Sequence, residues 1–246
     1  MARAKAGTAA RPTLLRLLLR WTWRTLLLAL IALAAVQFWC LVHVWYWVDH
    51  NPETTAFMRA RLEILREDNP RAKLRRQWVP YQRISAHLKR AVVASEDAKF
   101  ATHRGFDWDG IRHALERNLR EGEIVAGGST ITQQLAKNLF FTGERAWWRK
   151  AQEAAVTVML ETIMSKRRIL EIYLNVIEWG EGVYGAEAAA RHHYGISAAA
   201  LDAGQAARLA AIVPSPRRYG PGSNTAYLQQ RTQTILARMN SAAIPR

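Results

Sequence analysis

The sequence contains very little cysteine and comparatively few acidic residues. Cys40 is the only cysteine among 246 residues, which excludes an intramolecular disulfide, a four-cysteine zinc site and a thioredoxin-like cysteine pair. Aspartate and glutamate together number 20, against 35 lysines and arginines, so the formal net charge is +15. A charge of this size attracts nucleic acid, anionic lipid or a phosphate-bearing substrate, and charge alone does not choose among the three.

The sequence also lacks a tandem repeat and a strong compositional bias. Hydrophobic residues make up 50% and charged residues 22%, which argues against a disordered chain and against several membrane spans. A chain of 246 residues accommodates one sizeable globular domain and an appendage, but not two large enzymatic domains. One catalytic domain is therefore the working hypothesis.

One long apolar segment lies near the N-terminus. Residues 26–48 carry no formal charge, and roughly 23 apolar residues are enough to cross a hydrocarbon core of about 30 Å as a helix. Residues 1–25 contain six basic side chains and no acidic one, so the positive-inside rule places this segment in the cytoplasm and the rest of the chain outside. A cleaved signal peptide is the alternative, but its apolar region is usually about 7 to 15 residues long, and no small-residue cleavage motif follows Val48.

This topology reduces the number of candidate anionic partners. The six N-terminal basic residues account for six of the fifteen net positive charges, so the external part remains basic. Because genomic nucleic acid is not on the outer side, we expect no nucleic-acid partner. The remaining candidates are lipid headgroups and a phosphorylated lipid substrate.

The external part is predicted to be mainly α. Residues 49–76 are charged and bounded by prolines, which indicates a helical stalk or linker with few buried contacts. The folded domain then spans residues 77–246, where strand-like alternation is scarce and apolar residues recur at helical spacing, as at Ile111 and Leu115. One apolar stripe at this spacing comprises Ile169, Leu170, Tyr173, Leu174 and Ile177. The last predicted helix lies after the loop at residues 220–224. Its expected buried face comprises Leu228, Ile235, Leu236 and Met239.

Two adjacent acidic residues stand at the predicted end of a helix. Glu96 and Asp97 point to different sides of such a helix, so only one of them faces a given cleft. An isolated pair of this kind is most often a solvated surface feature.

A glycine pair precedes a second helix. Ser129 or Thr130 can cap the free amides at its start. Thr130, Gln134 and Lys137 follow at i, i+4 and i+7, so they share a face whose positive end lies at the glycines and could hold a phosphate. An exposed polar helix face is the alternative. Ser129 is not expected to be an acyl-transfer nucleophile, because the chain contains neither SxxK nor KTG.

Three further pairs are ambiguous by themselves. Arg149 and Glu153 have the i, i+4 spacing of an ordinary surface salt bridge. The DWD sequence at residues 107–109 has the form of a metal-binding DxD, but so short a pattern arises often by chance. His192 and His193 lack a matching ligand motif at zinc spacing.

The order of the motifs is more specific than any one of them. EDAKFATHRG, GGSTITQQLAKN, RKAQE, KRRILEIYLN and GEGVYGAEAAARHHYG follow one another between about residues 78 and 219. Together they closely resemble the glycosyltransferase family 51 domain of peptidoglycan polymerases. Because one anchor and WVPY precede the motifs and no transpeptidase domain follows, the chain resembles the monofunctional members.

The resemblance implies a lysozyme-like, two-lobed glycosyltransferase domain with a long cleft and a smaller, membrane-apposed lobe. Its substrate would be lipid II, an undecaprenyl-pyrophosphoryl disaccharide-pentapeptide, which is joined to the growing glycan chain. Glu96 matches the family's catalytic base and Glu153 its second glutamate. Gln205 and the HHYG sequence depart from the usual pattern of the second lobe.

The resemblance also assigns roles around the leaving pyrophosphate. Lys137 and Arg149 are the candidate cations, and Glu153 would orient them or bind a divalent cation such as Mg²⁺ or Mn²⁺; no organic cofactor is expected. The predicted additional substrate contacts are Ser129, Thr130, Gln134, Asn138 and Lys150, and the predicted supporting residues are Asp97, Phe100 and His103.

Two other functions remain open on the sequence alone. A lysozyme-like lytic enzyme would share the fold class and depend on a glutamate, but would cut preformed glycan. A membrane-tethered scaffold would bind anionic lipid or cell-wall proteins through its basic surface. For the polymerase, the expected location is the cytoplasmic (inner) membrane, and the candidate protein partners are other cell-wall synthesis or division proteins.

Overall fold

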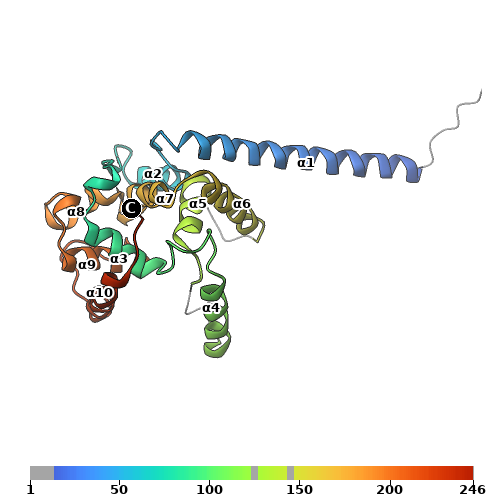
Figure 1. The fold of residues 1–246 in the computed structure, drawn as a ribbon. Helices are drawn as coiled ribbons and strands as arrows, with labels where there is room; N and C mark the ends of the chain where they lie inside the picture. Colours follow the sequence, from blue (N-terminus) through green and yellow to red (C-terminus); the bar gives the residue numbers. More distant parts are fainter. Residues whose placement is uncertain (1–13, 123–126, 143–146, 246) are drawn as a thin grey trace, which may run out of the picture. The chain divides into compact units, whose positions relative to one another are not determined.

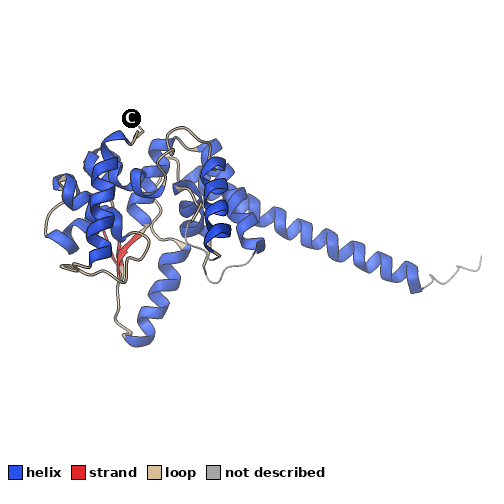
Figure 2. Cartoon of the chain, turned by 90° about the horizontal axis from the view of Figure 1, so that it is seen from below, coloured by secondary structure: helices blue, strands red, loops and turns tan. Residues whose placement is uncertain are grey.

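The computed structural model describes residues 14–122, 127–142 and 147–245, and these are mainly helical (Figures 1 and 2). The chain divides into two compact units, Met1–Val42 and His43–Arg246. Most of the basic N-terminal segment that we predict to be cytoplasmic lies outside the described residues.

The first unit consists of most of helix α1 (Leu14–Tyr46). Its stretch Arg16–Tyr46 has a mean hydropathy of 2.4 and is long and apolar enough to cross a membrane. The helix begins before the apolar segment predicted at 26–48, because a leucine-rich run precedes that segment. Its large apolar side chains are exposed along nearly the whole helix, whereas a core helix would bury them. The helix is therefore consistent with a single membrane anchor.

The segment 49–76 is not merely a linker. Helix α2 (Ala56–Asp68) begins at the N-cap Thr55, whose side chain accepts a hydrogen bond from the Met58 amide. Thr55 and Met58 are 0% and 1% exposed, and α2 packs against α5 (Ile131–Phe140). The expectation of few buried contacts is wrong for this segment, because its charged composition conceals the apolar first turn of α2.

Helices α5, α6 (Trp147–Ile163) and α7 (Lys166–Val176) form one part of the core, in which α5 contacts both of the others. The apolar stripe predicted along α7 is buried, including Leu170 and Tyr173 at 0% exposure. Burial of this stripe against α5 is what brings Tyr173 close to the polar face of α5.

Helices α3 (Ala86–Glu96), α9 (Ala203–Ile212) and α10 (Ala226–Arg238) form the other part, and α9 packs against both neighbours. The structure confirms the buried positions at Leu228, Ile235 and Met239. Leu236 was predicted to be buried and is 40% exposed, because one residue after Ile235 the helix has turned by about 100° toward solvent.

Helix α4 (Trp108–Glu121) extends away from the other helices of its unit (Figure 1). Apolar spacing at Ile111 and Leu115 predicted the helix, and its strong amphipathic pattern is visible in the sequence. However, none of the residues of α4, all of which the structure describes, is buried, and Leu115 and Leu119 are 58% and 74% exposed.

A small sheet completes the fold. Its order is β1 (Arg75–Arg76), β3 (Val183–Tyr184) and β2 (Glu178–Gly180), with β1 parallel and β2 antiparallel to β3. Helix α8 (Ala186–Tyr194) follows β3 directly. Short 3₁₀ turns occur at Tyr81–Arg83, Ala198–Ala200 and Met239–Ser241.

Candidate active site

Glu96 is the last residue of α3, and its side chain lines a cleft of ≈ 770 Å³. Gln134 donates its side-chain amide to one carboxylate oxygen (Nε2 to Oε2, 2.9 Å), and Ser95 donates its hydroxyl to the other (Oγ to Oε1, 3.1 Å). The guanidinium of Arg231, from α10, lies 3.6 Å from the same Oε1. A carboxylate oxygen has a second lone pair, so each can still accept a proton from a bound hydroxyl.

The cleft brings most of the predicted site residues together. From this group it is lined by Glu96, Ser129, Gln134, Lys137, Asn138, Arg149, Lys150 and Glu153. They come from the end of α3, the start and exposed face of α5, and the first turns of α6. Val213 and Pro214, which follow α9, add an apolar wall.

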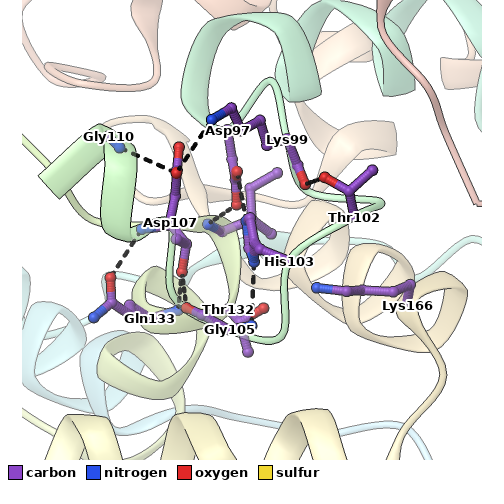
Figure 3. Close-up of polar contacts among 12 residues, drawn as sticks. Asp97, Lys99, Thr102, His103, Gly105, Asp107, Gly110, Thr132, Gln133 and Lys166 are labelled. Atoms are coloured by element: carbon purple, nitrogen blue, oxygen red, sulfur yellow. Dashed lines mark hydrogen bonds and ion pairs between the residues drawn. The ribbon is translucent and has the colours of Figure 1, made fainter. Parts of the chain in front are cut away.

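Asp97 has a different environment from its neighbour. Its Oδ1 accepts a hydrogen bond from His103 (Nε2, 2.8 Å), and its Oδ2 accepts one from the main-chain amide of Ile131 (3.0 Å) at the start of α5. His103 Nδ1 in turn accepts from the Gly105 amide at 3.1 Å (Figure 3). The side chain of Asp97 is 2% exposed and connects the end of α3 to α5. Of the two adjacent carboxylates, Glu96 is therefore the one that lines the cleft.

Thr130, rather than Ser129, caps α5. Its hydroxyl accepts from the Gln133 amide (3.2 Å) and donates to the Gly105 carbonyl (2.7 Å). Thr130 is only 2% exposed, so its hydroxyl is committed to the protein and Ser129 is the one that lines the cleft.

Gly105 fixes the loop between Asp97 and α4. Its φ is +86°, and a Cβ atom there would lie 2.7 Å from Cγ2 of Thr157 on α6. A side chain would therefore be both strained and obstructed. In the same loop Phe100 is 0% exposed, and Nζ of Lys166 lies 4.5 Å from the centre of its ring. The predicted supporting residues Asp97, Phe100 and His103 therefore stabilise the loop that follows α3, beside the cleft.

Glu153 organises two cations on the cleft wall. Its Oε1 lies 3.3 Å from Arg149 Nε and its Oε2 lies 3.1 Å from Lys150 Nζ. Lys150 Nζ also donates to Ser129 Oγ at 3.5 Å. Arg149 and Glu153 are 7% and 4% exposed, so this i, i+4 pair is not the surface salt bridge that its spacing alone indicates.

The surroundings of Glu153 fit a divalent cation poorly. Both carboxylate oxygens already face positive groups, which would repel a metal ion. Within the described ranges, no group of three histidine, cysteine, aspartate or glutamate side chains is arranged to hold a metal. Mg²⁺ is commonly bound by one or two carboxylates together with substrate phosphates, so it is the two cations already held by Glu153 that argue against a metal ion there.

The DWD sequence has a structural explanation. Asp107 is the N-cap of α4 and accepts from the Gly110 amide at 3.0 Å (Figure 3). Lys99 Nζ lies 2.8 Å from Asp109 Oδ2 and 3.8 Å from Asp107 Oδ1. The two aspartates therefore share Lys99, and Asp107 also caps the helix.

Two residues that the sequence did not identify also hold the site. Tyr173 of α7 donates its hydroxyl to Gln134 Oε1 at 2.7 Å. Arg231 of α10 donates to the hydroxyl of Ser95 at 3.2 Å, beside Glu96. Tyr173 lies in a recognisable motif, but its apolar stripe indicated only burial. The sequence around Arg231 carries no signal for a site.

Comparison with known proteins identifies the family of this chain. The model of the Transglycosylase family matches residues 63–240. A biosynthetic peptidoglycan transglycosylase of Methylobacillus flagellatus is 60% identical over 223 residues, which are 91% of this chain and 97% of that protein. Proteins of the same name from Nitrosospira multiformis and Laribacter hongkongensis are each 58% identical, over 92% and 93% of this chain and 98% and 100% of their own lengths. The chain therefore belongs to the transglycosylase family.

Proposed function

We propose that Glu96 is the catalytic base with which this peptidoglycan glycosyltransferase joins lipid II to a growing glycan strand. Membership of the family and the biosynthetic relatives make the protein an enzyme of glycan polymerisation. The observation that carries the assignment of the base is the meeting of Glu96 with Lys137, Arg149 and Lys150 in one cleft.

The base is needed because a sugar hydroxyl is a poor nucleophile at neutral pH. A carboxylate within hydrogen-bond reach accepts the hydroxyl proton as the new bond to the anomeric carbon forms. Glu96 is suited to this role, because its side chain is held by Gln134 and Ser95 and still opens to the cleft. The proton leaves the acceptor's alcohol and ends on this carboxylate.

The leaving group is a pyrophosphate, so charge accumulates on its oxygens as the sugar bond breaks. Lys137, Arg149 and Lys150 supply positive charge in the same cleft, and fixed charges of this kind stabilise a transition state without reorganisation. Glu153 keeps two of these cations in place. Ser129 and Asn138 are the polar groups that we assign to the same oxygens.

Attack by the acceptor opposite the departing pyrophosphate inverts the anomeric centre. An α-linked donor then gives a β-1,4-linked glycan, released undecaprenyl pyrophosphate, and no covalent sugar intermediate. None of these steps requires a metal ion at Glu153.

The apolar helix α1 would hold the enzyme on the membrane that carries its substrate. By the positive-inside rule, its N-terminus lies in the cytoplasm and the catalytic unit lies on the outer face of the inner membrane. Confinement of enzyme and lipid to one plane raises their encounter frequency. Other cell-wall synthesis or division proteins are the protein partners that we expect there.

Replacement of Glu96 by glutamine tests the base, because it removes the acceptor at nearly constant shape. Full-length Glu96→Gln in detergent, incubated with labelled lipid II, should show turnover at least about 100-fold lower. Glu63→Gln, at an exposed position on α2, is the matched control and should polymerise normally. Unchanged turnover in Glu96→Gln would refute the assignment.

The same assay separates the alternative functions. A lytic enzyme would leave lipid II unchanged and shorten preformed glycan, whereas a scaffold would keep its function in Glu96→Gln. We expect the wild type to lengthen glycan and to release polyprenyl pyrophosphate in equal amount to the bonds formed.

A further inference from the structure

The hydrogen bond from Gln134 to Glu96 is one half of a longer chain. Gln134 Nε2 donates to Glu96 Oε2 at 2.9 Å, and Gln134 Oε1 accepts from the Tyr173 hydroxyl at 2.7 Å. The three residues come from α3, α5 and α7, so three separate helices meet at this point. The carboxamide of Gln134 is therefore engaged at both ends.

The direction of these two hydrogen bonds follows from which groups can donate and which can only accept. Burial, together with the nearby carboxylates of Glu96 and Asp97, raises the pKa of Tyr173 well above its usual value. The phenol therefore keeps its hydrogen at neutral pH and can donate it to an amide oxygen. A carboxylate only accepts, so the amide nitrogen of Gln134 has to face Glu96 and the amide oxygen is left facing Tyr173. The opposite orientation would place a carbonyl oxygen against a carboxylate and repel it.

Tyr173 is also the rigid end of this series of hydrogen bonds. Its side chain is 0% exposed within the core stripe of α7, whereas Gln134 is only half-buried and lines the cleft. A glutamine at a cleft wall has several rotatable bonds, and holding it in one rotamer costs conformational entropy. A hydrogen bond from a fully fixed phenol provides the constraint that the cleft itself does not.

We infer that Tyr173 is a positioning residue for glycan polymerisation, acting through Gln134 to hold the Glu96 carboxylate toward the acceptor hydroxyl. The inference rests on the proposed role of Glu96 as the base. Tyr173 need not touch the substrate. Its hydroxyl holds the oxygen end of the carboxamide, and so keeps the nitrogen end on one carboxylate oxygen of Glu96 and the other lone pairs directed into the cleft.

Removal of one oxygen atom tests this role. In Tyr173→Phe the carboxamide is held at one end only and samples other rotamers, so kcat should fall about tenfold, a part of the 10²–10⁴ that a general base contributes. KM for lipid II should change less than twofold, because Lys137 and Arg149 are untouched. Both constants are measured on the full-length protein with labelled lipid II, and the melting temperature is recorded for each variant.

A double-mutant cycle distinguishes positioning from general support of the fold. Gln134→Met interrupts the chain from its other end at similar side-chain volume and should lower kcat by at least as much. If Tyr173 acts through Gln134, adding Tyr173→Phe to Gln134→Met causes no further loss of kcat. A loss of the same size in both backgrounds would mean that the hydroxyl acts independently of Gln134, and would overturn the inference.

The control is Tyr184→Phe, which removes another hydroxyl from a tyrosine that is also 0% exposed, on β3. It should keep wild-type kcat even if its melting temperature drops. Glu96→Gln runs in parallel. Activity in Glu96→Gln would refute the proposed base. An inactive Glu96→Gln with a fully active Tyr173→Phe would refute the positioning role of Tyr173 alone. If Tyr173→Phe fails to fold, normal kcat in Gln134→Met still refutes that positioning role.

Discussion

At the scale of single residues, the cations of the cleft are not equivalent. Arg149 is 7% exposed and lies against Glu153, so its position is fixed before substrate arrives. Lys137 is exposed on the open face of α5. A lysine ammonium is a compact point charge on a flexible stem, which can follow a pyrophosphate as it moves away from the sugar.

Lys137→Ala should therefore impair the chemical step more than the fold. We expect kcat/KM for lipid II to fall about 100-fold, the effect of losing one preorganised group that stabilises transition-state charge. The melting temperature should stay within about 2 °C of the wild type, because exposed substitutions usually cost under 0.5 kcal/mol. Lys73→Ala, also exposed but outside this cleft, serves as the control. Near-normal turnover in Lys137→Ala would remove this residue from the site.

Sequence reasoning reached the residues whose motifs are local and missed those that act across the fold. The cap of α5 follows from a short local pattern, because a helix start and its capping residues lie within a few positions, whereas Glu96 was assigned from the ordered motifs of the family. Several contacts around Glu96 join distant segments, since Tyr173 is 39 positions from Gln134 and Arg231 is 136 from Ser95. No periodicity within one segment specifies a contact of that kind.

At the scale of elements, helix α8 contains two histidines whose pKa values are lowered by the fold. Burial lowers the pKa of His192, aided by His193 and Arg75. Burial likewise lowers the pKa of His193, with Arg208 and Arg75 acting in the same direction, although its hydrogen bond to the Trp179 carbonyl opposes the shift. Neither histidine therefore adds stability by binding a proton.

These pKa shifts make the stability of the folded protein depend on pH. The unfolded chain binds protons at about pH 6.5 and the folded chain only at lower pH, so stability is lost as pH falls below that value. The melting temperature of the full-length protein should decrease between about pH 7 and pH 5. His193→Gln keeps a donor for the Trp179 carbonyl and should reduce this slope. His113→Gln, at a side chain that is 79% exposed on α4, should leave it unchanged, and equal slopes in both variants would contradict the assignment.

Elements were predicted where a helix has a buried stripe or a capping residue, and less well where burial depends on another segment. The stripe of α7 and the start of α5 were correct. The apolar spacing of α4 indicated a helix but not that its apolar face would remain exposed. In α2, the burial of Met58 depends on α5, which lies more than seventy positions later.

At the scale of the whole molecule, the cleft and most of the apolar helix α1 belong to different units. Apart from Cys40, the buried apolar side chains of the described chain all belong to the unit His43–Arg246. The first unit contributes an apolar helix and basic charge. The catalytic cleft lies within the second unit, so the chemistry and the membrane attachment can be tested independently.

Deletion of residues 1–42 should therefore separate two activities that the full chain combines. The fragment 43–246 should polymerise lipid II in detergent with a kcat within about threefold of the full chain, because its cleft and core are intact. In vesicles that carry lipid II, its turnover should fall about 100-fold, since the substrate is confined to the bilayer and the enzyme no longer is. An unrelated polyleucine helix in place of residues 14–42 should restore the vesicle activity, because confinement requires only an apolar span. Equal vesicle turnover with and without the first unit would show that the catalytic unit reaches its lipid substrate unaided.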